Sequence, residues 1–175
     1  MIIKIITNTI LIISLTVAQI SLISGLPDLV GDLNLVLVVL IFILGFSNFD
    51  FAVWWTIGVG FLLEVFSFLP FGAYLVSLSL TLMVANFLLN YFFTNRSLYS
   101  FLALTGLATV IYELIINFYV LIFIEINLVA GSAAGNFWFF RLEQIGLNLS
   151  LALIIYYIIY FLGRNFKPVF LIKKY

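Results

Sequence analysis

The sequence contains neither cysteine nor histidine. Their absence excludes disulfide bonds, thiol nucleophiles, thiolate or imidazole metal ligands, and histidine acid–base chemistry. Charged residues make up only 8% of the 175 positions, against about 25% in an average soluble domain. The net charge is zero and no basic run is present. A protein that follows a nucleic-acid backbone needs such basic residues, so we expect no nucleic-acid binding.

What the chain has in abundance is apolar surface, since 66% of its residues are hydrophobic. A soluble domain of ~150 residues still exposes about a third of its unfolded area, so it could not bury this much. The apolar runs are continuous, whereas a membrane barrel would alternate polar and apolar residues. One crossing takes about 20 helical residues, which leaves room for about five or six. We predict an all-α polytopic membrane protein with a single integral membrane domain over residues 1–175.

Short polar turns divide the chain into six expected spanning helices. A Pro70-Phe71-Gly72 corner joins the third helix to the fourth. The second helix is apolar on all sides, and we expect it to be the most lipid-exposed. The other helices are expected at residues 1–25, 33–46, 73–93, 98–126 and 137–162.

The basic residues predict the orientation. With six crossings, Arg141 alone falls on the side opposite both termini. The positive-inside rule therefore places both termini in the cytoplasm. The residues on that side are Lys4, Arg96, Arg164, Lys167, Lys173 and Lys174.

One carboxylate, Glu64, stands in the middle of the third expected helix. A charge inside hydrocarbon costs roughly 3 kcal/mol on insertion scales, so its position needs a physical reason. Polar and small neighbours at helical spacing form one face with it, and we expect this face to point into the bundle. These neighbours are Thr56, Gly60 and Ser67.

Two further helices carry polar stripes: Thr105, Thr109, Glu113 and Asn117 in the fifth, and Arg141, Gln144 and Asn148 in the last. At 1.5 Å per residue, Glu64, Glu113 and Arg141 fall at similar depth in the outer half of a bilayer core ~30 Å thick. We predict that Arg141 bridges to Glu113 or Glu64. The expected buried cluster, which is either structural or a ligand or partner contact, comprises Glu64, Glu113, Arg141, Asn117, Gln144 and Asn86.

No catalytic constellation is found in the sequence. Asp28 and Asp32 are the nearest approach to paired acids, but they lie on an expected aqueous turn with too few further ligands for a tight metal site. Intramembrane proteolysis would need Ser-His or paired Asp residues within helices. We therefore predict a protein that is not an enzyme, with no catalytic, cofactor-binding or metal-binding residues.

Three segments carry a family resemblance. GFLLEVFSFLPFGAYLVSLSL (60–80), LPDLV (26–30) and VIYELI (110–115) resemble segments of the rod shape-determining protein MreD family. Glu64 stands at the acidic position of that family, although the family usually has Asp there. The other matching positions are Pro27, Asp28, Pro70, Gly72, Tyr74 and Tyr112.

The resemblance implies a non-enzymatic scaffold in the bacterial inner membrane, supporting cell shape and lateral peptidoglycan synthesis in the rod complex. The implied partners are an MreC-like coiled-coil protein, other membrane proteins of the elongation complex, and the lipid bilayer. The implied fold is like that of the substrate-binding subunits of energy-coupling factor transporters. A vitamin-binding subunit of such a transporter is the alternative. Those subunits resemble one another in an Ala-x-x-x-Ala motif, where this chain has only Ser14-x-x-x-Ala18.

Overall fold

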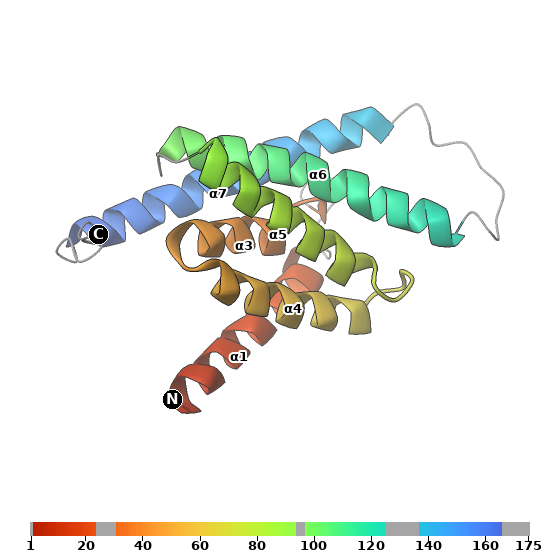
Figure 1. Ribbon diagram of the computed structural model, residues 1–175, viewed down its shortest axis with the longest axis horizontal. Coiled ribbons are helices and arrows are strands. Elements are labelled where there is room, and N and C mark those ends of the chain that lie inside the picture. The colour runs from red at the N-terminus through yellow and green to blue at the C-terminus, as the bar shows by residue number, and fades with distance from the viewer. Residues whose placement is uncertain (1, 24–30, 94–96, 125–136, 166–175) are drawn as a thin grey trace.

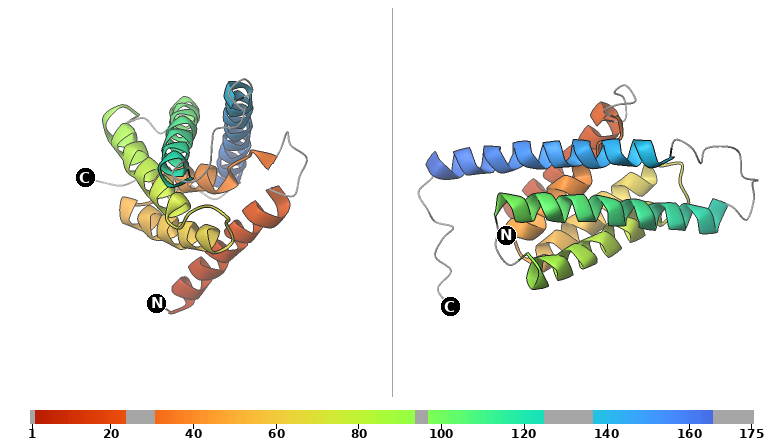
Figure 2. Two further views of the ribbon diagram at one scale, coloured as in Figure 1. Left: turned by 90° about the vertical axis from the view of Figure 1, so that its right-hand side faces the viewer. Right: turned by 90° about the horizontal axis from the view of Figure 1, so that it is seen from above.

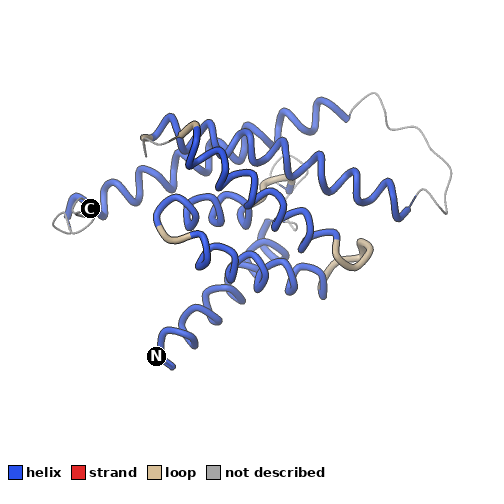
Figure 3. The backbone as a smooth tube through the Cα atoms, in the orientation of Figure 1, coloured by secondary structure: helices blue, strands red, loops and turns tan. Residues whose placement is uncertain are grey.

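The computed structural model describes residues 2–23, 31–93, 97–124 and 137–165 (Figure 1). These residues are helical apart from the connecting turns, as the tube drawing in Figure 3 shows. The α-helices are α1 (Ile2–Val17), α3 (Leu35–Phe46), α4 (Phe49–Val65), α5 (Ala73–Tyr91), α6 (Leu98–Ile124) and α7 (Phe137–Asn165). A π-helical segment, η1 (Ala18–Ile23), continues α1.

Four of these helices contain segments that are long and apolar enough to cross a membrane. They are Ile3–Ser21, which runs from α1 into η1, and Ala73–Tyr91, Leu98–Val120 and Leu142–Phe161. The predicted all-helical membrane protein is thereby confirmed. Helix α3 has 12 residues and α4 has 17, about 18 and 26 Å at 1.5 Å per residue. Six crossings and cytoplasmic termini remain predictions.

Helix α3 lies at the centre of the bundle. Helices α4, α5, α6 and α7 pack side by side in chain order, and α3 contacts each of them (Figure 2). Helix α1 packs on α3 and α4, and its N-terminal end projects from the bundle (Figure 1).

The expectation that this second helix is the most lipid-exposed is wrong. Val36, Val38 and Ile41, which point in different directions around α3, are all fully buried. A helix that is apolar all round is buried whenever other helices surround it. The exposed apolar helix is instead α1, whose Ile3, Ile10 and Val17 are each more than half exposed.

Helices α4 and α5 form the expected hairpin, and their close approach depends on Gly60. A Cβ added at Gly60 would lie 3.2 Å from the Cα of Leu75. Thr56, Gly60 and Glu64 are buried, which confirms the inward face predicted for them. Ser67 lies beyond the end of α4 and is half-buried.

Candidate functional site

Glu64 caps the N-terminus of α5. Its Oε1 accepts hydrogen bonds from the backbone N–H groups of Tyr74 (2.6 Å) and Leu75 (3.0 Å). The first N–H groups of a helix have no partner within the helix, and the helix dipole favours a negative charge there. Glu64 is 6% exposed, and its Oε2 has no hydrogen-bond partner among the described residues. The acid of the third predicted helix therefore stabilises the start of the fourth.

The corner between the two helices is held by α6. Gly72 has φ +100°, a left-handed conformation that side chains disfavour. The hydroxyl of Tyr119 donates a 2.7 Å hydrogen bond to the carbonyl oxygen of Phe71. A Cβ at Gly72 would lie 2.6 Å from the same Tyr119 oxygen. Both the backbone conformation and the neighbouring hydroxyl therefore require glycine at this position.

The N-terminus of α3 is capped by three amide side chains. Asn34 Oδ1 accepts from the backbone N–H of Leu37 (2.9 Å). Gln19 of η1 donates through Nε2 to the carbonyl of Leu33 (3.0 Å), and its Oε1 accepts from the Val36 N–H (3.4 Å). Asn148 Oδ1 accepts from the Asn34 N–H (2.9 Å). Amides inside a lipid-embedded bundle need such partners, since an unpaired one costs several kcal/mol.

Asn148 also joins α7 to α6. Its Nδ2 donates to the hydroxyl oxygen of Thr109 (3.1 Å), and both residues are fully buried. The Thr109 hydroxyl in turn donates to the carbonyl oxygen of Thr105 (2.9 Å). The polar stripes of the two helices therefore meet inside the bundle at Thr109 and Asn148.

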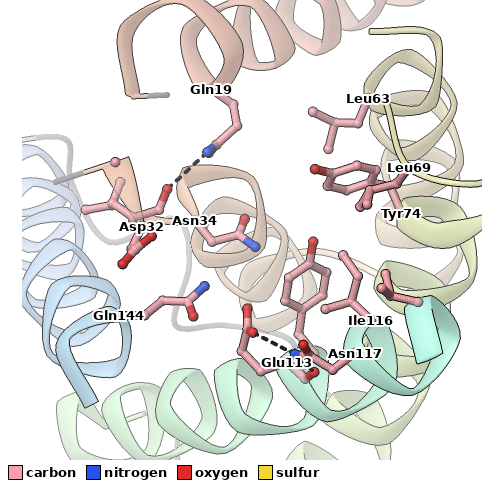
Figure 4. Close-up of a pocket in the computed structure, with 14 residues that line it drawn as sticks. Gln19, Asp32, Asn34, Leu63, Leu69, Tyr74, Glu113, Ile116, Asn117 and Gln144 are labelled. Atoms are coloured by element: carbon pink, nitrogen blue, oxygen red, sulfur yellow. Dashed lines mark hydrogen bonds between the residues drawn. The ribbon is translucent and has the colours of Figure 1, made fainter. Parts of the chain in front are cut away.

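A cavity of about 360 Å³ lies between the capped starts of α3 and α5 (Figure 4). Its walls come from η1, residues 31–34 before α3, α4, the 66–72 turn, α5, α6 and α7. Its polar lining consists of Gln19, Asp32, Asn34, Tyr74, Tyr112, Glu113, Asn117 and Gln144. Its other lining residues are Gly31, Leu33, Leu63, Leu69, Ile116 and Val120.

Glu113 and Asn117 are one helical turn apart on the cavity wall and interact directly. Asn117 Nδ2 donates to Glu113 Oε2 (3.2 Å) and to the Glu113 carbonyl oxygen (2.6 Å). From α7, the amide of Gln144 extends toward the same space (Figure 4). The arrangement holds one carboxylate oriented at the cavity wall.

The structure brings together five of the residues singled out from the sequence. Glu113, Asn117, Gln144, Tyr74 and Tyr112 all line the cavity. Pro70 contributes to the corner, where its carbonyl accepts from the Ala73 N–H (3.1 Å). Glu64 is linked to the cavity through the backbone of Tyr74.

The remaining predicted residues lie elsewhere. Asn86 is twelve positions beyond Tyr74 on α5, about 18 Å along the helix axis; it accepts a 3.3 Å hydrogen bond from Asn90 Nδ2. The side chain of Arg141 lies outside the described part of the chain, so its bridge to Glu113 or Glu64 remains a prediction. Pro27 and Asp28 also lie outside the described residues.

The residues that sequence reasoning missed are Gln19, Asp32 and Asn34. Asn34 had a usable signal, because an Asn directly before an apolar run is typical of an N-cap. Gln19 is an isolated amide in an apolar segment, and its partners, the backbone groups of Leu33 and Val36, cannot be read from local spacing. Asp32 was assigned to an aqueous turn but lines the cavity.

The described residues contain no cluster of three or more His, Cys, Asp or Glu side chains placed to bind a metal ion. The cavity instead offers hydrogen-bonding side chains and carboxylates.

No family model, curated protein or solved structure matches this chain.

Proposed function

We propose that this protein is a non-enzymatic membrane scaffold of the bacterial cell-elongation complex, of the kind represented by the MreD family. It would reside in the inner membrane, cross it six times with both termini in the cytoplasm, and bind an MreC-like coiled-coil protein. Its role would be to hold that complex in the membrane and so support cell shape and lateral peptidoglycan synthesis.

The observation that supports this proposal best is that two residues at MreD-like positions, Glu64 and Gly72, shape the corner between α4 and α5. Glu64 caps α5, and Gly72 provides the left-handed corner that Tyr119 holds. These residues build and hold the corner of the α4–α5 hairpin. The motif that carries the resemblance is therefore one that specifies a fold, as a scaffold requires.

Depletion of the protein in its own bacterial host tests the function. We expect rod-shaped cells to become round and to recover with the wild-type gene. Gly72→Val should fail to restore the rods, because Tyr119 occupies the space and the backbone conformation is strained. Gly146→Ala is a matched control, since nothing lies within 4 Å of its added Cβ. Depleted cells that keep their rod shape would contradict the proposal.

The crossing number depends on where the α3–α4 turn lies. Helix α3 is about 18 Å long, shorter than a hydrocarbon core of ~30 Å. With six crossings, the turn at Asn48 faces the cytoplasm; if α3 and α4 instead enter and leave on one side, it does not. Because the chain has no cysteine, a single Asn48→Cys variant gives an unambiguous label. We expect a membrane-impermeant thiol reagent to label it only from the cytoplasmic side, as it should label the Arg96→Cys control.

The cavity favours a second candidate, the vitamin-binding subunit of an energy-coupling factor transporter. Its volume of about 360 Å³ lies within the range of small-molecule pockets, about 300–1,000 Å³. Adjacent ATPase genes and a vitamin that copurifies with the protein would support this candidate. Adjacent genes for an actin-like protein and a periplasmic coiled-coil protein would support the scaffold.

A further inference from the structure

The 66–72 turn between α4 and α5 presents exposed aromatic side chains and no charge. Phe66, Phe68 and Phe71 are 62%, 107% and 74% exposed. The sequence has no charged residue between Glu64 and Arg96, so the turn lies within a long uncharged run. Exposed apolar residues gathered in this way mark a contact with lipid or with another protein surface.

The length of α4 places this turn short of the far membrane surface. Asp50, in the first turn of α4, is charged and exposed, so it marks the level of one aqueous face. Phe66 lies sixteen positions later, which is about 24 Å along a helix. Since the hydrocarbon core is ~30 Å thick, the turn begins about 6 Å inside its far boundary. A tilt of α4 would place the turn deeper still.

Helix α6 gives a similar depth independently. The hydroxyl of Tyr119 donates to the carbonyl oxygen of Phe71, so Tyr119 marks the level of the turn on α6. Beyond Tyr119, α6 continues for five apolar residues, Val120 to Ile124, about 8 Å at 1.5 Å per residue. Figure 1 and Figure 2 both show the end of α6 extending past the turn. Such an apolar segment is favourable in hydrocarbon, which therefore extends beyond the turn.

The turn also meets the requirement that lipid places on a non-helical backbone. Polar backbone groups in hydrocarbon need partners within the protein. The N–H of Leu69 donates to Ser67 Oγ (2.8 Å), and the carbonyl oxygen of Phe71 accepts from the Tyr119 hydroxyl (2.7 Å). Pro70 has no N–H to satisfy. Hydrogen bonds of this kind lower the cost of placing the turn in the membrane.

We propose that the 66–72 turn inserts among the acyl chains of the far leaflet, with Phe66 and Phe68 in contact with lipid. Lipid is favoured over a second protein chain because the lengths of α4 and α6 both place hydrocarbon at the level of the turn. The hairpin returns to the side from which it entered, so the sidedness proposed above is unchanged. The inference goes beyond the scaffold function, because it gives the protein an apolar anchor in one leaflet.

The depth of the turn is measured on the purified full-length chain in nanodiscs. Because the chain has no cysteine, Phe68→Cys carries a nitroxide label at a single, fully exposed position. Electron paramagnetic resonance compares collisions of the label with oxygen, which concentrates in hydrocarbon, and with a neutral nickel chelate, which stays in water. We expect oxygen to collide more often. Both faces of a nanodisc are open to the chelate, so the result does not depend on sidedness.

Matched positions calibrate this measurement. Asn48→Cys, on the exposed turn before α4, should collide more often with nickel. Phe61→Cys, at a half-exposed position within α4, should resemble Phe68→Cys. Phe66→Cys repeats the measurement if Phe68→Cys does not fold. Lipids with shorter acyl chains should increase nickel collisions at Phe68 more than at Phe61, because the membrane boundary then moves toward the turn.

Two results would overturn the proposal. More frequent collisions with nickel than with oxygen at both Phe66 and Phe68 would place the turn in water. Shielding of both positions from oxygen and nickel alike would mean that another part of the chain, or a second copy, covers them. Cell shape after depletion is measured separately, so the scaffold function and this inference can fail independently.

Discussion

Helices α1 and α3 are both strongly apolar, yet they occupy opposite environments. Val36, Val38 and Ile41 of α3 are fully buried, whereas Ile3 of α1 is 79% exposed. In lipid, apolar side chains gain little by leaving the solvent, so hydrophobicity does not decide which helix is central. The two helices differ instead in how their polar groups are satisfied.

The hydroxyl groups of α1 and η1 bond within their own helix. Thr9 donates to the carbonyl of Ile5 and Thr16 to that of Ile12, each four residues earlier. The start of α3, in contrast, depends on Gln19 and Asn148, which come from other helices. A helix whose polar side chains bond to its own backbone can face lipid. A helix whose N-terminal backbone groups need side chains from other helices is held among those helices.

The largest test of this difference is removal of side-chain volume. Ile41→Ala in α3 should lower the free energy of unfolding by about 2–4 kcal/mol, because its closely packed neighbours leave a cavity behind. Ile13→Ala in α1, where the side chain is 47% exposed, should change it by about 0.5 kcal/mol or less. Both variants are unfolded in mixed micelles by titration with a denaturing detergent. The titration measures the difference between their losses in free energy of unfolding. Equal losses would show that α1 is packed as tightly as α3.

A smaller effect is expected from the hydrogen bonds that hold α3. Asn148→Leu keeps the side-chain size but leaves the Asn34 N–H without its acceptor. It should cost about 1–3 kcal/mol, the penalty of an unsatisfied buried donor. Ser150→Ala on the same helix is the control, since that exposed hydroxyl bonds only to its own turn at Leu147. If the same micelle titration shows equal stability for the two variants, the cap is not what holds α3 in place.

The smallest effect is expected from adding one methyl group where α3 packs on α6 and where α4 packs on α1. Gly45→Ala in α3 would place a Cβ 2.3 Å from the ring of Phe101, which is 2% exposed and stacked on Phe42. Gly58→Ala in α4 would meet Ile12 of α1 at 3.1 Å, at the end of a flexible side chain. Both gain the same helix propensity, so that gain cancels in the comparison. We expect Gly45→Ala to be less stable by about 1 kcal/mol or more. The reverse order would mean that α1 has the more rigid contact.

The sequence allowed some of this arrangement to be predicted. The inward face of Glu64 followed from helical spacing, and so did the position of Glu113 and Asn117 on one face of α6, where they are hydrogen-bonded. Both depend only on the geometry of a single helix. The helical membrane class followed from the composition together with the continuous apolar runs.

Other features required knowledge of tertiary structure. An apolar helix surrounded by helices and one surrounded by lipid have the same sequence pattern, so the burial of α3 was mispredicted. The partner of Glu64 is a set of backbone N–H groups that depends on the Gly72 corner. Asn34 and Asn148 are 114 positions apart, and neither local spacing nor composition links them.

The bond between Asn34 and Asn148 has a consequence for biosynthesis. The chain emerges from the ribosome N-terminus first, so α3 is made well before the residue that completes its cap. Until α7 enters the bilayer, the Asn34 N–H must bond to water, lipid headgroups or the insertion machinery. The cap of α3 is therefore completed only when α7 has been inserted, and a nascent chain that stops before α7 would hold its central helix in an incomplete state.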